Sequence, residues 1–90
     1  MRVKGELIEA PRPEYPDEAK KQKVEGTVTV TITIGEEGKV IFARAKSGPS
    51  ILHEASVTAA YKARFKPSTV NGKPVKVAAI MTYDFKLDNN

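Results

Sequence analysis

The clearest pattern in the chain is a strict alternation of polar and apolar residues from Thr27 to Ile34. Threonine alternates with valine or isoleucine throughout this stretch. Because the side chains of a strand point alternately to its two faces, the pattern predicts a strand with one buried and one wet face. Such strands are typical of antiparallel sheets that are covered on one side.

A second strand is expected after a short hairpin loop. Residues 35–38 read Gly-Glu-Glu-Gly, which is a turn sequence, and residues 39–45 form the return strand. Its alternation fails at Val40, Ile41 and Phe42, which are three consecutive apolar residues. This break predicts a β-bulge near Ile41. The sequence leaves open which of these side chains faces the core.

The sequence also predicts two helices. Residues 16–22 predict a short helix, since proline suits the start of a helix and the acidic residues Asp17 and Glu18 suit its first turn. Residues 51–63 predict a longer helix with Ser50 as its N-cap. Its apolar stripe is mostly small, which predicts close packing on the sheet; the stripe consists of Leu52, Ala55, Ser56, Ala59, Ala60 and Ala63.

The last predicted element is a strand from Val75 to Leu87, more than twice the usual length of about 5–6 residues. Ala78, Ile80 and Thr82 leave the middle of its outer face without charge. In a three-stranded sheet two strands are edges, and an edge offers unpaired N–H and C=O groups. The strand is therefore either a solvated edge or a site of β-augmentation by a peptide or by a second copy of the domain.

The order of elements predicts the fold class. Helix, strand, strand, helix and strand together favour an α+β fold, in which a three-stranded antiparallel sheet is packed on one face by two helices. Residues 1–10 are expected to form a poorly ordered or extended N-terminal arm, and residues 11–90 a single domain. No apolar stretch of about 18 residues predicts a transmembrane helix, and no apolar run after Lys4 predicts a signal peptide.

Charge and composition narrow the function. A formal net charge of +4 permits weak, salt-dependent contact with nucleic acid, but no arginine cluster interleaved with aromatic residues is present, so nucleic acid is not an expected partner. The chain has no cysteine, and His53 is its single histidine, so neither a metal set nor a cofactor is expected. Glu36 and Glu37 lie in a predicted turn, where solvation is favoured over acid–base catalysis. We therefore do not expect an enzyme.

The chain also carries four short motifs in order: Pro13-Glu14-Tyr15-Pro16, Glu25-Gly26-Thr27-Val28, Ala63-Arg64-Phe65-Lys66-Pro67 and Asn71-Gly72-Lys73-Pro74-Val75. Together they resemble the C-terminal domain of TonB-type energy transducers, over residues 11–87. The resemblance implies a periplasmic domain of a bacterial protein anchored in the inner membrane, with the anchor absent from this chain.

The resemblance also implies a function. The domain would grip the TonB box, a short peptide at the N-terminus of an outer-membrane receptor, by strand addition to the last strand. It would thereby couple the proton-motive force to uptake of iron chelates or cobalamin, with an inner-membrane proton-channel complex as a second partner of the full-length protein. The alternative is a self-associating domain, a homodimer through the last strand, appended to another bacterial membrane protein. The implied peptide-binding residues are Arg12, Pro13, Glu14, Tyr15, Pro16, Ile80, Met81, Thr82, Tyr83, Asp84, Phe85 and Lys86.

Overall fold

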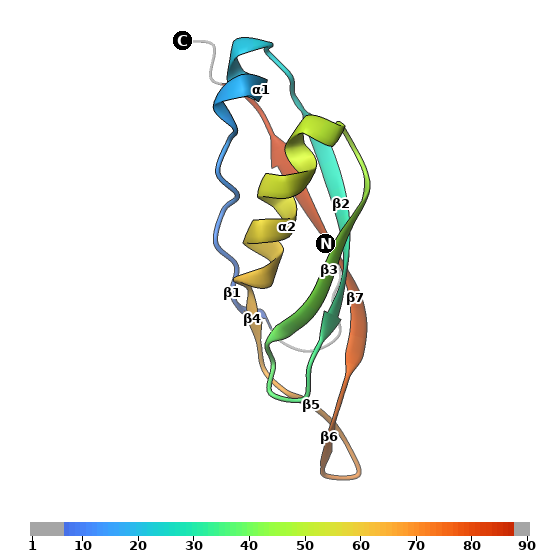
Figure 1. The fold of residues 1–90 in the computed structure, drawn as a ribbon. Helices are drawn as coiled ribbons and strands as arrows, with labels where there is room; N and C mark the ends of the chain where they lie inside the picture. Colours follow the sequence, from blue (N-terminus) through green and yellow to red (C-terminus); the bar gives the residue numbers. More distant parts are fainter. Residues whose placement is uncertain (1–6, 88–90) are drawn as a thin grey trace.

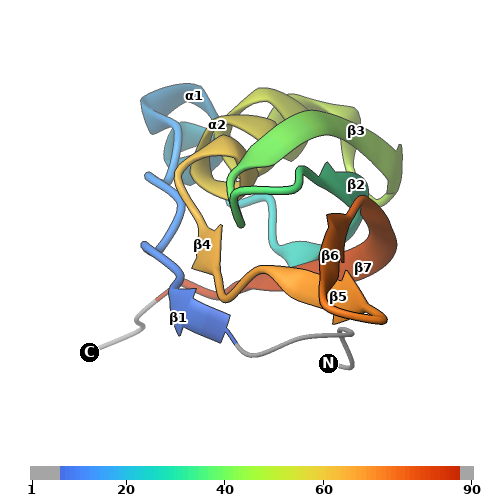
Figure 2. The same ribbon diagram turned by 90° about the horizontal axis from the view of Figure 1, so that it is seen from below.

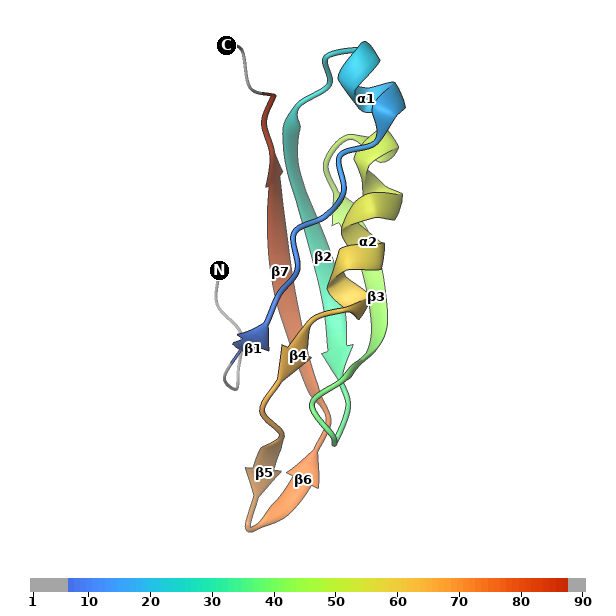
Figure 3. The same cartoon turned by 90° about the vertical axis from the view of Figure 1, so that its left-hand side faces the viewer.

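The computed structural model describes residues 7–87 as one α+β unit (Figure 1). A three-stranded antiparallel sheet has the strand order β3-β2-β7, and the helices lie on one of its faces (Figure 3). The predicted fold class is confirmed. The elements are β1 (Leu7–Glu9), α1 (Asp17–Lys21), β2 (Gly26–Ile34), β3 (Val40–Ser47), α2 (His53–Tyr61), β4 (Arg64–Phe65), β5 (Ser68–Val70), β6 (Lys73–Val75) and β7 (Val77–Phe85).

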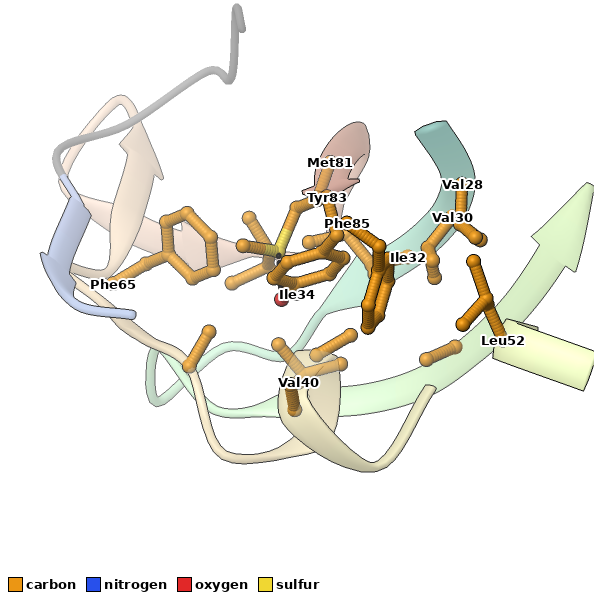
Figure 4. Packing of buried hydrophobic residues seen from close by; sticks show 14 of the residues in the cluster. Val28, Val30, Ile32, Ile34, Val40, Leu52, Phe65, Met81, Tyr83 and Phe85 are labelled. Carbon is orange, nitrogen blue, oxygen red and sulfur yellow. Dashed lines mark hydrogen bonds between the residues drawn. The ribbon is translucent and has the colours of Figure 1, made fainter. Parts of the chain in front are cut away.

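The core lies between the sheet and the helix layer. The central strand of the sheet, β2, contributes four buried side chains to it. The apolar residues of β2 are at most 2% exposed, whereas its threonines stay at least partly accessible, as the alternation predicted. Aromatic and aliphatic side chains from β7, β4, β3 and the 3₁₀ turn Ser50–Leu52 meet them (Figure 4). The labelled members of this cluster are Val28, Val30, Ile32, Ile34, Val40, Leu52, Phe65, Met81, Tyr83 and Phe85.

The predicted bulge in the return strand is confirmed. Thr33 pairs with Phe42 and Ile34 pairs with Val40, so Ile41 is left as the extra residue. Val40 is buried, while Ile41 and Phe42 are each 51% exposed. The bulge therefore settles which side chain faces the core.

The two edges of the sheet differ in regularity. A second shift in β3 lies where Thr29 pairs with Ser47 and Val30 with Ala45, which leaves Lys46 unpaired. Two bulges interrupt the edge that β3 offers, and bulges are a usual protection against further strand pairing. By contrast, β7 pairs with β2 over all nine of its residues without a shift. Of the two edges, β7 is thus the regular one.

The prediction of one strand from residue 75 to residue 87 is wrong. Val75 ends β6 and Val77 begins β7, with Lys76 between the two strands. The reason is the choice of partner, since β2 ends at Ile34 opposite Val77, and β6 pairs instead with β5. The alternation of apolar residues continues across Lys76, so the sequence pattern gave no sign of the break.

A hairpin of β5 and β6 therefore extends beyond the end of the sheet (Figures 1 and 3). Its turn is Asn71-Gly72, with φ of 53° and 78°. Positive φ at both central residues is the geometry of a type I′ turn, for which Asn-Gly is the favoured sequence. The Asn-Gly motif thus joins two strands of a separate ribbon.

The predicted start of the long helix is also wrong. Ser50 does not cap it, because a 3₁₀ turn spans Ser50–Leu52 and α2 begins only at His53. The N–H of Leu52 donates to the carbonyl of Pro49, which satisfies a backbone group that a cap would otherwise serve. The predicted stripe does face the core: Leu52, Ser56, Ala59, Ala60 and Ala63 are buried and Ala55 is partly buried.

Two very short strands were not foreseen. β1 pairs with β4 in antiparallel fashion, with Leu7 opposite Phe65 and Glu9 opposite Arg64 (Figure 2). The pair joins residues almost sixty positions apart, so no local pattern could reveal it. Residues 1–6 of the predicted arm, and residues 88–90, lie outside the described part. Within residues 7–87 no helix is long and apolar enough to cross a membrane.

A lysine occupies a backbone position that suits glycine at the end of α1. The N–H of Val24 donates to the carbonyl of Ala19 at 2.9 Å, and the N–H of Lys23 to that of Lys20 at 3.1 Å. This is a Schellman arrangement, in which the residue with left-handed backbone is usually glycine. Here that residue is Lys23, with φ of 56°.

We therefore expect Lys23→Gly to raise the free energy of unfolding by about 0.5–1 kcal/mol, because glycine adopts this conformation without steric cost. Chemical denaturation of the two proteins measures the change. Lys21→Gly, inside the helix, serves as the matched control and should lower the stability by up to about 1 kcal/mol. A loss of stability in Lys23→Gly would contradict the prediction.

Candidate functional site

The segment from Ala10 to Pro16 runs beside α2 in the layer that covers the sheet (Figure 3). Three prolines, at positions 11, 13 and 16, hold it extended. One groove separates this segment from β7, and another separates it from α2. The segment is thus a shared wall between two grooves.

The groove beside β7 has a volume of about 620 Å³. Its walls are the extended segment on one side and the second half of β7 on the other. The residues that line it are Ala10, Pro11, Arg12, Pro13, Tyr15, Met81, Thr82, Tyr83, Asp84, Phe85 and Lys86.

Nine of the twelve residues implied by the resemblance line this groove. The other three are Glu14, Pro16 and Ile80. Glu14 and Pro16 line the second groove, which faces α2. Ile80 lies on the outer face of the sheet and is 45% exposed. The structure therefore brings two distant stretches of sequence together around one groove.

Tyr15 fastens the extended segment to the rest of the domain. Its hydroxyl group donates a hydrogen bond to the carbonyl of Val24, in the loop after α1. Its ring meets the ring of Phe85 edge to face, with centroids 5.3 Å apart and an interplanar angle of 89°. Such an arrangement is favourable for aromatic pairs. Tyr15 thereby holds one end of the groove, while the pairing of β1 with β4 holds the chain near its other end.

The phenol of Tyr15 is kept in its neutral form. Loss of solvation, and secondly the negative charge of Glu25, raise the pKa of Tyr15 above its usual value. Burial likewise raises the pKa of Tyr83, whose hydroxyl group lies 3.7 Å from the sulfur of Met81. Both hydroxyl groups therefore remain donors throughout the neutral pH range.

Two side chains of the Glu25-Gly26-Thr27-Val28 motif, which the sequence analysis did not place among the peptide-binding residues, hold the end of β7. The hydroxyl of Thr27 donates to the carboxylate of Asp84 at 2.6 Å, across the ladder between β2 and β7. The N–H of Leu87 donates to the carboxylate of Glu25, also at 2.6 Å. Both contacts span more than fifty residues, so spacing along the chain gives no signal for them.

The backbone of β7 supplies the main hydrogen-bonding groups of the groove. β7 has β2 on one side and no strand on the other among the described residues. In an antiparallel pair, every second residue directs its N–H and C=O groups away from its partner strand. About half of the nine residues of β7 therefore present unpaired backbone donors and acceptors along this edge.

The groove beside α2 is smaller, at about 470 Å³, and its charges are mixed. Arg12 and Lys62 carry positive charge there, while Glu14, Asp17 and Glu54 carry negative charge. No single sign dominates, so this groove favours no charged ligand. It does leave the extended segment accessible on both sides.

Among the described residues, neither groove gathers a metal-binding set. Within residues 7–87 no three His, Cys, Asp or Glu side chains come together around a position for a metal ion. The imidazole Nε2 of His53 lies 2.8 Å from the carbonyl of Gly48, so this ring is engaged by the backbone. What the site offers is a strand edge and a proline-stiffened wall.

Comparisons with known proteins agree with this architecture. Residues 11–87 match the family model described as the Gram-negative bacterial TonB protein C-terminal. A solution NMR structure of the Pseudomonas aeruginosa TonB C-terminal domain is similar, with 30% sequence identity and a TM-score of 0.73 over 94% of this chain and 88% of that chain. A search of curated proteins found no match. The family model covers most of the chain, and the chain therefore belongs to the family of C-terminal domains of Gram-negative TonB proteins.

Proposed function

We propose that this domain binds an extended peptide by strand addition to β7, and that the peptide is the TonB box of an outer-membrane receptor. The observation that carries the proposal is the regular, unpaired edge of β7 at the wall of a groove. Membership of the TonB family supports the identity of the peptide. The peptide would lie between β7 and the extended segment, with its backbone paired to β7.

The free energy of binding that this edge can supply is typical of a reversible complex. Each backbone hydrogen bond contributes a net ~0.5–1.5 kcal/mol, and the groove-lining half of β7 offers a few outward groups. Apolar contact with the partly exposed ring of Tyr15, in the wall of the groove, adds to this. Ordering a flexible peptide offsets part of the gain. An affinity in the micromolar range, which corresponds to about −8 kcal/mol, is the expected outcome.

The larger role proposed follows from the family. In a full-length protein, an inner-membrane anchor and its proton-channel complex would pull on the domain from the periplasmic side. The grip on the receptor peptide would then couple the proton-motive force to uptake of iron chelates or cobalamin. Nothing in the domain needs to catalyse a reaction for this role, because the domain transmits force through a bound strand.

Amide hydrogen exchange provides the direct test. In the free domain, every second amide of β7 from Met81 to Phe85 should exchange fast. A synthetic peptide with the TonB-box sequence of a Pseudomonas aeruginosa receptor should slow those same amides at least about tenfold, because they gain partners. Two-dimensional NMR reports each amide separately. The amides of β3, the bulged edge, are the internal control and should not change.

The alternating pattern distinguishes strand addition from other kinds of contact. Slowing of all β7 amides alike would indicate general stabilisation, and no slowing at saturating peptide would count against the proposal. A peptide with proline at every second position is the matched ligand control, since it lacks the necessary N–H groups.

Self-association through β7 remains a second candidate function, because the same edge can accept another copy of β7. Sedimentation at several protein concentrations separates the two. A concentration-dependent dimer that dissociates on addition of the TonB-box peptide would show that the peptide and the second copy of the domain use the same edge. A strictly monomeric domain would remove this candidate.

A further inference from the structure

The net positive charge of the chain is concentrated in one short stretch. Residues 64–77 contain four of the 15 basic residues and none of the 11 acidic residues. The rest of the chain therefore has 11 of each and is neutral overall. The formal charge of +4 belongs to β4, the hairpin of β5 and β6, and the start of β7. A lysine-rich coat spread over the whole surface would not give this distribution.

The hairpin in this stretch projects from the body of the domain. It lies beyond the end of the three-stranded sheet, at the pole opposite α1 (Figure 1). Residues 69–74 are all exposed, and Val70 near its tip is 58% exposed. A Cβ atom placed on Gly72 would meet nothing within 4 Å. The hairpin thus buries little apolar surface, although an isolated two-stranded hairpin is at best marginally stable.

The charges on the hairpin are not neutralised within the described part of the chain. Neither Lys73 nor Lys76 forms an ion pair with any of residues 7–87, and both are exposed. Glu36 and Glu37 lie nearby in the loop between β2 and β3, but this loop packs on β4 at the base of the hairpin, through the bond from the Phe65 N–H to the Gly38 carbonyl. Lys73 and Lys76 therefore carry positive charge that no carboxylate of residues 7–87 pairs with.

The hairpin is continuous with the edge proposed to bind the peptide. β6 leads into β7 through the single residue Lys76, so the two strands follow one another along the same side of the domain (Figure 3). A strand that pairs with β7 and continues past Val77 would arrive beside the hairpin. At this end, its residues would meet the lysines of residues 64–77, a stretch that contains no Asp or Glu.

We propose that the hairpin of β5 and β6 binds an acidic stretch of the partner peptide. This stretch adjoins the peptide segment that pairs with β7. Lys73 and Lys76 supply the positive charge, and the type I′ turn holds the ribbon in place. The inference rests on the proposed function and adds a rule for partner choice: an extended, uncharged segment flanked on one side by Asp or Glu. Because the hairpin lies at one end of β7, the acidic stretch must lie at one end of the peptide.

Three fluorescent peptides test this rule by anisotropy. The first is the TonB-box peptide used above, the second carries four Asp residues at its N-terminus, and the third carries them at its C-terminus. At about 50 mM salt, one extended peptide should bind about threefold to tenfold more tightly than the plain peptide, and the other should not. The gain should vanish near 0.5 M salt. The flank that gains also reveals the direction of the bound strand.

A double variant locates the effect. Lys73→Gln with Lys76→Gln should abolish the gain and leave the affinity for the plain peptide unchanged. The control, Lys20→Gln with Lys21→Gln, removes equal charge from α1 at the other pole and should retain the gain. Equal gain at both flanks, or a gain that survives the hairpin variant, would overturn this inference alone. No gain at either flank would do the same, whereas failure of all three peptides to bind would overturn the proposed function as well.

Discussion

Replacing Gly38 by alanine is expected to destabilise the domain by at least about 3 kcal/mol. A Cβ atom on Gly38 would lie 1.9 Å from the carbonyl oxygen of Phe65, far inside van der Waals contact, and this backbone cannot move independently of the core. The same residue has φ of +87° and accepts the N–H of Phe65 at 2.9 Å. The loop between β2 and β3 would have to leave β4, and Phe65 would lose its anchor. Urea denaturation measures the loss.

The hairpin turn offers a matched control for this prediction. Gly72 also has positive φ, at 78°, but open space surrounds it. Gly72→Ala should therefore cost only the conformational penalty of about 1 kcal/mol. If the two variants lose equal stability, the close approach to Phe65 is not what requires glycine at position 38.

Replacing Phe85 by alanine is expected to cost about 3–5 kcal/mol, the usual range for deletion of a buried aromatic ring. Phe85 is 3% exposed at the end of β7, and its ring supports that of Tyr15. Small domains have total stabilities near the lower end of about 5–15 kcal/mol, so this loss would leave the fold only marginally stable at room temperature. Chemical denaturation, followed by far-UV circular dichroism, gives the free energy.

Neighbouring variants separate packing from local structure. Lys86→Ala, one residue further and exposed, should change the stability by less than about 0.5 kcal/mol. Phe85→Leu should retain a folded core while losing the edge-to-face contact, and should weaken peptide binding because the wall formed by Tyr15 is released. Full stability and full affinity in Phe85→Leu would show that the aromatic pair does not position the groove.

Strong periodicity and turn chemistry predicted much of the fold. The alternation around Val28 and Ile32 gave β2 and its buried face, because burial of one face is the cause of that alternation. The consecutive apolar residues around Ile41 correctly indicated a bulge. These features are local, so each can be read from a window of a few residues.

The errors arose where distant contacts decide the structure. Lys76 interrupts the last strand because β2 has no residue left to pair with it, and the short strands β1 and β4 exist because they meet in space. Lys23 takes a glycine-like conformation without any sign in its own sequence. Ser50 has the composition of an N-cap, yet the 3₁₀ turn removes the need for one.

The candidate site shows the same division. The resemblance named both walls of the groove by residue number, yet it could not tell which side of the extended segment each residue faces. Glu14 turned out to face α2, while its neighbour Tyr15 packs on Phe85. Thr27 and Glu25 belong to a motif found in the sequence, but their role at the end of β7 became visible only through their partners Asp84 and Leu87.

The unequal edges of the sheet have a consequence for stoichiometry. A guest strand on β7 occupies the regular edge, and the bulges at Ile41 and Lys46 make the opposite edge a poor acceptor. Each domain should accordingly hold one guest at a time, and two domains joined through β7 would have no regular edge left for a third. Growth into longer arrays stops at this point, which lets an exposed β-edge persist in a crowded compartment without seeding fibres.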